Sequence, residues 1–257
     1  MVQNVTLRQR IRDGSLLMGS FVKTPAYQIV EVMGAAGLDF LAIDAEHAPF
    51  GRKDIDACML AARAWDIPAL VRLSGTSDAS VLEVLDTGAA GIISAHAQSA
   101  AAVRKVVRAT RYRDGSRGFS ASHRAGGYGG VGMAEYIDRS DRNTVVICQI
   151  EDRAGVEQIE DIVTVDEVDC LFLGMADLAV SLGVDGVMHE KVQEAVKVVT
   201  SVCRQAHRTV GMFLPDMRQL AYYKDLGVRL FIIGSDQSVL RGTLGARIKD
   251  FRSATAV

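Results

Sequence analysis

The sequence predicts a single (β/α)₈ barrel, and three observations support this prediction. The chain has 257 residues, a length that is typical of one closed α/β barrel. Short apolar runs alternate with segments of helical period, which is the pattern of repeated βα units. No glycine-rich GxGxxG fingerprint follows the first of these runs, which disfavours a dinucleotide-binding fold. We therefore expect one barrel domain over residues 1–257.

Eight apolar runs rich in Val, Ile, Leu and Phe are predicted to form the strands. They span Leu16–Val22, Leu38–Asp44, Ala69–Leu73, Gly91–Ser94, Thr144–Ile150, Val168–Gly174, Thr209–Leu214 and Val228–Gly234. Runs this continuous suit parallel strands that are covered on both faces. Most segments between them have helical period; the apolar residues between Val192 and Ala206, for example, share one helix face.

The composition argues against several classes of partner and location. Lys and Arg number 29 against 31 Asp and Glu, and the basic residues are scattered among acidic ones, which disfavours nucleic acid or a membrane surface as a partner. No stretch approaches the roughly 18 uncharged apolar residues of a membrane span, and the polar start does not look like a signal peptide. The four cysteines form no CxxC pair, which predicts reduced thiols and a cytoplasmic location.

One connection, residues 111–128, departs from this regular alternation. It lies between the fourth and fifth predicted strands and places Arg117, His123 and Arg124 among several glycines. A long glycine-rich connection in a compact domain is more often functional than accidental, so His123 and Arg124 are candidate substrate-binding residues. The alternative is a flexible excursion whose cations are simply solvated.

Chemically active side chains follow the predicted strands where these strands end. In barrels of this kind the carboxyl ends of the strands carry the chemistry. The residues found there are Asp44, Glu46 and His47 after strand two, Arg72 in strand three, Ser94 and His96 at strand four, Gln149 and Glu151 at strand five, Asp177 after strand six, Leu214 at the end of strand seven, and Ser235 and Asp236 after strand eight. Acids, a base and a guanidinium are therefore expected to converge on one rim, with Gln149 and Leu214 among the substrate contacts.

Glu151 and Asp177 are the predicted metal ligands. A hard divalent cation prefers oxygen ligands and keeps some of its waters, so two carboxylates and a chelating 2-oxo acid would complete an octahedron. Strand-end acids are also commonly helix caps, and this alternative remains open for Asp177. No set rich in His or Cys indicates zinc.

His47 and Arg72 are the predicted acid–base and charge-stabilising residues. Asp44 is close enough in sequence to orient the His47 imidazole and raise its basicity. An arginine such as Arg72 holds a developing enolate oxygen, or a carboxylate in two-point fashion. The alternatives are a structural histidine and a salt bridge at the rim. No lysine stands out at a strand end for Schiff-base chemistry.

Several motifs together resemble the HpcH/HpaI-type class II pyruvate aldolases over nearly the whole chain. They are Asp44-Ala45-Glu46-His47-Ala48-Pro49, Val71-Arg72, Leu85-Asp86-Thr87-Gly88-Ala89-Ala90-Gly91, Ser116-Arg117-Gly118, Gln149-Ile150-Glu151 and Gly174-Met175-Ala176-Asp177-Leu178. Six motifs in the order of the family are specific, whereas any one alone is not. Ser122-His123-Arg124-Ala125 further looks like the branch that cleaves 5-keto-4-deoxy-glucarate; 4-hydroxy-2-oxoheptanedioate aldolases are similar as well.

The resemblance implies a reaction, a cofactor and an assembly. Pyruvate and an aldehyde would be released from a 4-hydroxy-2-oxo acid, with Mg²⁺, Mn²⁺ or Co²⁺ held by Glu151 and Asp177. Arg72 would steady the enolate oxygen, His47 with Asp44 would move the proton, and amides near Ala176 and Asp177 would hold the pyruvate carboxylate. Members are commonly hexamers built as trimers of dimers, in which the Asp86 region helps to complete a neighbour's site.

Some positions depart from the family pattern, and other functions remain open. Met175 and Ala179 replace the usual Pro and Ser around the metal aspartate, and Ser94-Ala95-His96 replaces a more apolar, Pro-containing strand end. These changes leave the acceptor aldehyde undetermined. An acyl-CoA lyase of the citramalyl or malyl type is the alternative enzyme, and a non-catalytic binding barrel is the alternative outside catalysis.

Overall fold

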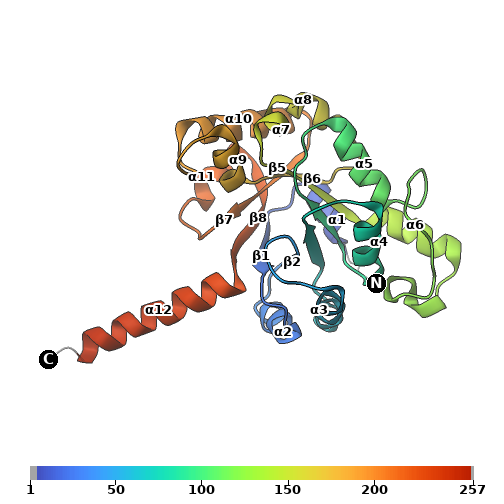
Figure 1. Cartoon of the computed structure of the whole chain (residues 1–257), viewed down its shortest axis with the longest axis horizontal. Coiled ribbons are helices and arrows are strands. Elements are labelled where there is room, and N and C mark those ends of the chain that lie inside the picture. Colours follow the sequence, from blue (N-terminus) through green and yellow to red (C-terminus); the bar gives the residue numbers. More distant parts are fainter. Residues whose placement is uncertain (1–4, 256–257) are drawn as a thin grey trace.

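Eight parallel strands close into a barrel, which confirms the predicted fold (Figure 1). The computed structural model describes residues 5–255. The strands are β1 (Leu17–Val22), β2 (Phe40–Asp44), β3 (Ala69–Leu73), β4 (Gly91–Ser94), β5 (Val145–Ile150), β6 (Cys170–Leu173), β7 (Thr209–Leu214) and β8 (Val228–Ser235). Each strand pairs with the next in sequence, and β8 pairs with β1. Each predicted strand therefore corresponds to an observed one, with ends that differ by at most two residues.

Helices follow the strands and form the outer layer. They are α2 (Tyr27–Ala35), α3 (Arg52–Ala64), α4 (Asp78–Asp86), α5 (Ala100–Thr110), α6 (Met133–Asn143), α7 (Arg153–Glu157), α8 (Ile159–Ile162), α9 (Met175–Leu182), α10 (Glu190–Gln205) and α11 (Leu220–Leu226). Their apolar faces pack on the outward-facing strand residues, such as Val71 and Val146, and form the larger hydrophobic core. No helix among residues 5–255 has the length and apolarity needed to cross a membrane.

A second core fills the inside of the barrel. Inward positions alternate along each strand with outward ones, so Phe21, Ala42, Leu70, Ile147 and Phe172 all belong to this inner core. The next inward position along each of these strands, two residues later, lies at the carboxyl rim. The same alternation that fills the barrel therefore points the rim residues toward its axis.

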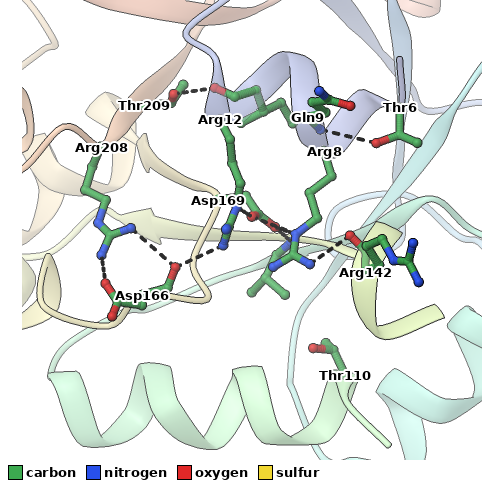
Figure 2. A network of polar contacts seen from close by, with 12 residues as sticks. Thr6, Arg8, Gln9, Arg12, Thr110, Arg142, Asp166, Asp169, Arg208 and Thr209 are labelled. Atoms are coloured by element: carbon green, nitrogen blue, oxygen red, sulfur yellow. Dashed lines mark hydrogen bonds and ion pairs between the residues drawn. The ribbon is translucent and has the colours of Figure 1, made fainter. Parts of the chain in front are cut away.

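Helix α1 (Leu7–Arg12) closes the opposite, amino-terminal end of the barrel. Its residues Leu7 and Ile11 are part of the inner core. Figure 2 shows the polar network that fixes this helix: Asp169, whose side chain is fully buried, lies 2.9 Å from Arg8 Nε and 2.6 Å from Arg12 Nε. Asp169 also accepts a hydrogen bond from the Val146 amide. The amino-terminal end is thus sealed by α1, and the site must open at the other rim.

Helix α12 (Asp236–Thr255) is the exception in the outer layer, because it projects away from the barrel (Figure 1). No residue of α12 is buried, although each of the other helices buries at least one. Its large apolar side chains are exposed: Val239, Leu240, Leu244, Ile248 and Phe251. Leu240, Leu244, Ile248 and Phe251 follow one another at helical spacing and so share one face.

Candidate active site

A cavity of about 810 Å³ opens at the carboxyl rim of the barrel. Its polar lining comes from seven of the eight strands or the residues after them, and includes Lys23, His47, Arg72, Gln149 and Asp177. Its apolar lining includes Phe21, Phe172, Met175, Val187, Met188 and Phe213. The predicted convergence of strand-end residues is therefore observed for His47, Arg72, Gln149 and Asp177.

Asp44 and Arg72 form a buried ion pair at the ends of adjacent strands. The two residues are paired in the β2–β3 register. Arg72 Nε donates to Asp44 Oδ1 at 3.0 Å, and Arg72 Nη2 lies 2.8 Å from Asp44 Oδ2. Burial by itself would raise the pKa of Asp44, but the Arg72 guanidinium, the His47 amide and the Lys23 ammonium lower it below 3.8. Asp44 is therefore a fixed negative charge that orients Arg72.

Arg72 is also held from two further directions. Its Nε lies 3.3 Å from Glu46 Oε2, and its guanidinium carbon lies 4.5 Å from the centre of the Phe21 ring. A guanidinium stacked on an aromatic face loses little freedom when it binds an anion. Arg72 is thus a rigid cation on the cavity wall, as its predicted role requires.

The His47 imidazole does not contact Asp44, which differs from the sequence-based expectation. Asp44 Oδ1 accepts instead from the backbone amide of His47 at 3.1 Å. The acidic neighbour of the imidazole is Glu46, whose Oε2 lies 3.7 Å from Nε2. The imidazole is 54% exposed, so solvent and substrate both reach it. Asp44 therefore shapes the turn that carries His47, and Glu46 is the carboxylate nearest to its ring.

Glu151 lies at the rim just beyond β5 and is almost completely buried. Its Oε1 accepts from the His96 amide at 2.7 Å, and its Oε2 accepts from the Gln149 side-chain amide. Burial raises the pKa of Glu151, and the negative charges of Glu46 and Asp177 raise it further, against the opposing effect of His96. Several acids thus share one electrostatic environment, which a bound cation would stabilise.

Two local features fit a cation at this place. Gln149 Oε1 is buried without a hydrogen-bond partner. A Cβ at Gly174 would lie 2.8 Å from Glu151 Oε2, so the glycine leaves space beside the carboxylate. Within residues 5–255 there is no group of three or more His, Cys, Asp or Glu side chains placed to hold a metal ion. The predicted two-carboxylate set of Glu151 and Asp177 therefore needs oxygen atoms from substrate and water to complete a coordination shell.

Helix α9 begins at the same rim and points its amino terminus toward the cavity. Ala176 and Asp177 belong to its first turn and line the cavity. The amides of a first helical turn have no partner within the helix and carry partial positive charge. The expected contact between these amides and a substrate carboxylate is therefore compatible with the observed position of α9.

The glycine-rich connection lies away from the cavity of its own chain. His123 Nε2 lies 3.3 Å from Asp86 Oδ1, and Arg117 Nη2 donates to the same oxygen at 2.9 Å. Arg124 Nη2 donates to Asp56 Oδ2 on α3 at 2.8 Å. Arg124 also lines a separate cavity beside Ile67–Ala69, where β3 begins. Arg124, His123 and Asp86 therefore do not reach the rim of the barrel that carries them.

Two residues at the rim differ from the sequence-based assignment. Leu214 is fully buried in the outer core, whereas its neighbours Phe213 and Pro215 line the cavity, because successive strand residues face opposite ways. Lys23 directly follows β1 and lines the cavity, although no lysine was expected at a strand end. The position of Lys23 could have been predicted, because the predicted first strand ended at Val22 and Lys23 is the next residue.

Known proteins resemble this chain over almost its full length. Residues 17–242 match the HpcH/HpaI aldolase/citrate lyase family. A hydroxypyruvate/pyruvate aldolase of Paraburkholderia phytofirmans is 32% identical over 256 residues, covering 96% of this chain and 97% of that protein. A 5-keto-4-deoxy-D-glucarate aldolase of Shigella boydii is 32% identical over 224 residues, which is 82% of each protein. The crystal structure of a Burkholderia cenocepacia protein of the same family superposes with a TM-score of 0.91 at 32% identity, covering 96% of this chain and 98% of that one.

Proposed function

Because the chain belongs to the HpcH/HpaI aldolase/citrate lyase family, we propose that it is a class II aldolase that cleaves 4-hydroxy-2-oxo acids to pyruvate and an aldehyde. The single observation that carries this proposal is the rim cavity, in which Arg72, His47 and Asp177 converge. Similar proteins are named hydroxypyruvate/pyruvate aldolase and 5-keto-4-deoxy-D-glucarate aldolase. The predicted family and the predicted enzyme class, a carbon–carbon lyase, are both confirmed.

We propose that a divalent ion, Mg²⁺, Mn²⁺ or Co²⁺, binds to Glu151 and Asp177. Such an ion supplies Lewis acidity, which stabilises negative charge on the keto oxygen of the substrate. The buried Glu151 carboxylate, the space left by Gly174 and the unpartnered Gln149 Oε1 support this assignment. Ala176 and Asp177 amides would bind the substrate carboxylate and so fix the donor half of the substrate.

His47 and Arg72 would carry out the remaining steps. Cleavage requires a base that removes the proton from the 4-hydroxyl group and an acid that returns a proton to the methylene carbon of the product. His47 lines the cavity and its imidazole is 54% exposed, so the ring is able to reach a substrate bound there and move that proton. Arg72, held by Asp44, would stabilise the developing enolate oxygen with its fixed positive charge.

Pyruvate release measured over a panel of 4-hydroxy-2-oxo acids tests the proposal. We expect turnover that is abolished by a chelator and restored by Mg²⁺, Mn²⁺ or Co²⁺. Glu151→Gln and Asp177→Asn should lose both metal affinity and turnover, whereas Glu157→Gln, an exposed acid on α7, should lose neither. Full activity in chelator would refute the metal assignment, and turnover only of acyl-CoA substrates would favour the lyase alternative.

The acceptor half of the substrate is proposed to be a hydroxylated or carboxylated aldehyde. Arg124 and His123 were predicted to bind it, but both lie outside the cavity of their own chain. They could therefore contact substrate only in the cavity of a neighbouring chain, as proposed for the Asp86 region. Hydrogen-bonding groups of this kind reject substrates that leave them unpaired.

We propose that the chain forms a homo-oligomer, a hexamer built as a trimer of dimers. Helix α12 supports an assembly because it offers an exposed apolar face that no other part of residues 5–255 covers. A second copy of the chain is the occupant that we propose for this face. The four cysteines, all buried and unpaired, support the proposed cytoplasmic location.

A further inference from the structure

Lys23 extends the cluster of charges formed by Asp44 and Arg72. Val22 pairs with Ile43 in the β1–β2 register, so Lys23 lies level with Asp44 and, through it, with Arg72. Lys23 Nζ lies 3.1 Å from Asp44 Oδ2, the oxygen that also faces Arg72 Nη2. The Asp44 side chain is completely buried, while that of Lys23 is 29% exposed. Two cations from neighbouring strands therefore meet one buried carboxylate.

The backbone of Lys23 is fixed by the junction between β8 and α12. The Asp236 carboxylate accepts from the Lys23 amide at 2.8 Å and from the Thr24 amide at 3.0 Å. Gln237 Nε2 donates to the Lys23 carbonyl at 3.3 Å. Because these contacts hold the peptide groups on both sides of Lys23, its side chain leaves β1 from a defined position.

The charges around Arg72 show what Lys23 contributes. Arg72 contacts two carboxylates, Asp44 and Glu46. If Arg72 were the only cation among them, these three side chains would carry a net negative charge. The Lys23 ammonium, which contacts Asp44, adds a second positive charge that balances the second carboxylate. An anionic substrate must bind at the same wall, and a net negative wall would oppose it. Because Lys23 compensates part of the Asp44 charge, the two carboxylates neutralise the positive charge of Arg72 less completely. Arg72 can therefore still attract an anionic substrate.

We propose that Lys23 is a positioning residue of this active site, which acts through Asp44 to hold Arg72 ready for the substrate. Its ammonium binds Asp44 Oδ2, while Oδ1 stays with Arg72 Nε and the His47 amide. This inference rests on the proposed aldolase reaction and adds a residue to it. Lys23 forms no bond to the substrate in this role, so Schiff-base chemistry is not involved.

The test measures kcat and KM for retro-aldol cleavage, with proton exchange at the pyruvate methyl group as the partial reaction. Lys23→Met should lower kcat about tenfold, the size of effect expected when contacting charges are coupled, and Lys23→Arg should recover most of it. Mn²⁺ affinity should stay at the wild-type value, because Glu151 and Asp177 are unchanged. Lys53→Met, an exposed lysine on α3, is the matched control and should leave both kinetic constants unchanged.

The decisive comparison repeats Lys23→Met in an Asp44→Asn background. If Lys23 acts through the Asp44 charge, the second substitution should change the residual proton exchange by less than about twofold. A full tenfold loss in that background would overturn the proposal, because Lys23 would then act on the substrate directly. Wild-type kcat in Lys23→Met would also overturn it. If Lys23→Met does not fold, Lys23→Gln takes its place, since it keeps an N–H donor without the charge.

The failure of this inference is distinguishable from failure of the proposed reaction. A wild-type protein that neither cleaves 4-hydroxy-2-oxo acids nor exchanges the pyruvate methyl protons would refute the proposed function. An active wild type whose turnover is insensitive to Lys23 would refute only the role of Lys23.

Discussion

Arg72 combines charge with a fixed shape, and substitutions separate the two contributions. It binds both oxygens of Asp44 and stacks on Phe21. Arg72→Lys keeps the charge but loses the planar fork, so kcat should fall less than in Arg72→Ala yet remain below wild type. Steady-state kinetics on one 4-hydroxy-2-oxo acid provides the measurement. Equal activity of Arg72→Lys and wild type would show that the guanidinium shape is not needed.

His47 should behave as a group that moves protons without binding the metal. His47→Ala should slow aldol cleavage and methyl-proton exchange by about 10²–10⁴-fold, the usual contribution of a general acid–base residue. Metal affinity should be nearly unchanged, because Glu151 and Asp177 remain. A loss below tenfold would assign the proton transfer to another group, and Glu46, the acid nearest to the imidazole, would be the first to examine.

The proposed metal ligand Glu151 should make metal binding depend on pH. Its pKa is raised above the ordinary value of 4.5, first by burial and also by Glu46 and Asp177. In the metal-free protein, folding therefore favours the protonated Glu151 carboxyl group. The stability that this protonation contributes to the folded state is lost as the pH rises through the raised pKa. Since the metal needs the carboxylate, the increase in Tm caused by Mg²⁺ should grow as the pH rises above 4.5. Glu151→Gln should remove that pH-dependent increase.

The rim residues show which parts of the site the sequence alone could predict. Asp44, Arg72, Gln149 and Asp177 were found because strand ends in a barrel share one rim and because an inward position recurs every second residue. The partner of the His47 ring was assigned incorrectly, because a turn decides whether Asp44 meets the amide or the imidazole. Leu214 was assigned to the cavity in place of its neighbours. Side chains of successive strand residues point to opposite faces, so an error of one residue exchanges the core and the cavity.

Helix α1 packs on the barrel through Leu7 and Ile11, and the buried Asp169 carboxylate anchors its two arginines. Asp169 accepts from Arg8, Arg12 and the Val146 amide (Figure 2). Asp169→Ala would leave the largely buried Arg8 guanidinium and a buried amide without this partner, so the free energy of unfolding should fall by about 3–5 kcal/mol. Asp166→Ala is the control, because that side chain is 89% exposed and its pairs should contribute less than about 1 kcal/mol. Urea unfolding of both variants checks this difference.

Helix α12 should control the assembly of the protein. Leu244 and Ile248 lie on its exposed apolar face, so Leu244→Asp together with Ile248→Asp should convert the oligomer to smaller species. Ala246→Asp places a negative charge on the opposite side of the helix and should leave the assembly intact. Light scattering coupled to size-exclusion chromatography reports the mass. An unchanged mass in the double variant would show that α12 does not hold chains together.

The direction of α12 could not be predicted from the sequence. Leu240, Leu244 and Ile248 recur at helical spacing, but the apolar face of α12 is weaker than that of α10, and Gly242 and Gly245 lie within the helix. The difference depends on whether the chain after Ser235 continues back along the barrel or outward, a tertiary property. Similarly, residues 111–128 were identified as unusual from composition, whereas their distance from the rim depends on how α4, α5 and α6 pack.

At the scale of the whole molecule, the residues proposed to bind substrate are divided between two ends of the barrel. The cavity at the carboxyl rim is lined by residues that we propose bind the donor half of the substrate. Arg124, the predicted contact for the acceptor half, lies near the start of β3. A single chain therefore cannot bring Arg124 to its own substrate without a large rearrangement, whereas an assembly of chains could supply it from a neighbour.

Mixed assemblies test whether Arg124 acts on a neighbouring cavity. Arg124→Ala chains should lose the preference for polar over aliphatic aldehydes, measured as a ratio of kcat/KM, because a hydrogen-bonding group no longer discriminates between them. Chains with Glu151→Ala should be inactive but still carry Arg124. When the two variants are unfolded and refolded together, active cavities in Arg124→Ala chains should meet Arg124 from their inactive neighbours, and the preference should return. Mixing with Glu151→Ala/Arg124→Ala chains should restore nothing. A preference that survives in pure Arg124→Ala, or that does not return in the mixture, would show that Arg124 does not bind the acceptor across a subunit boundary.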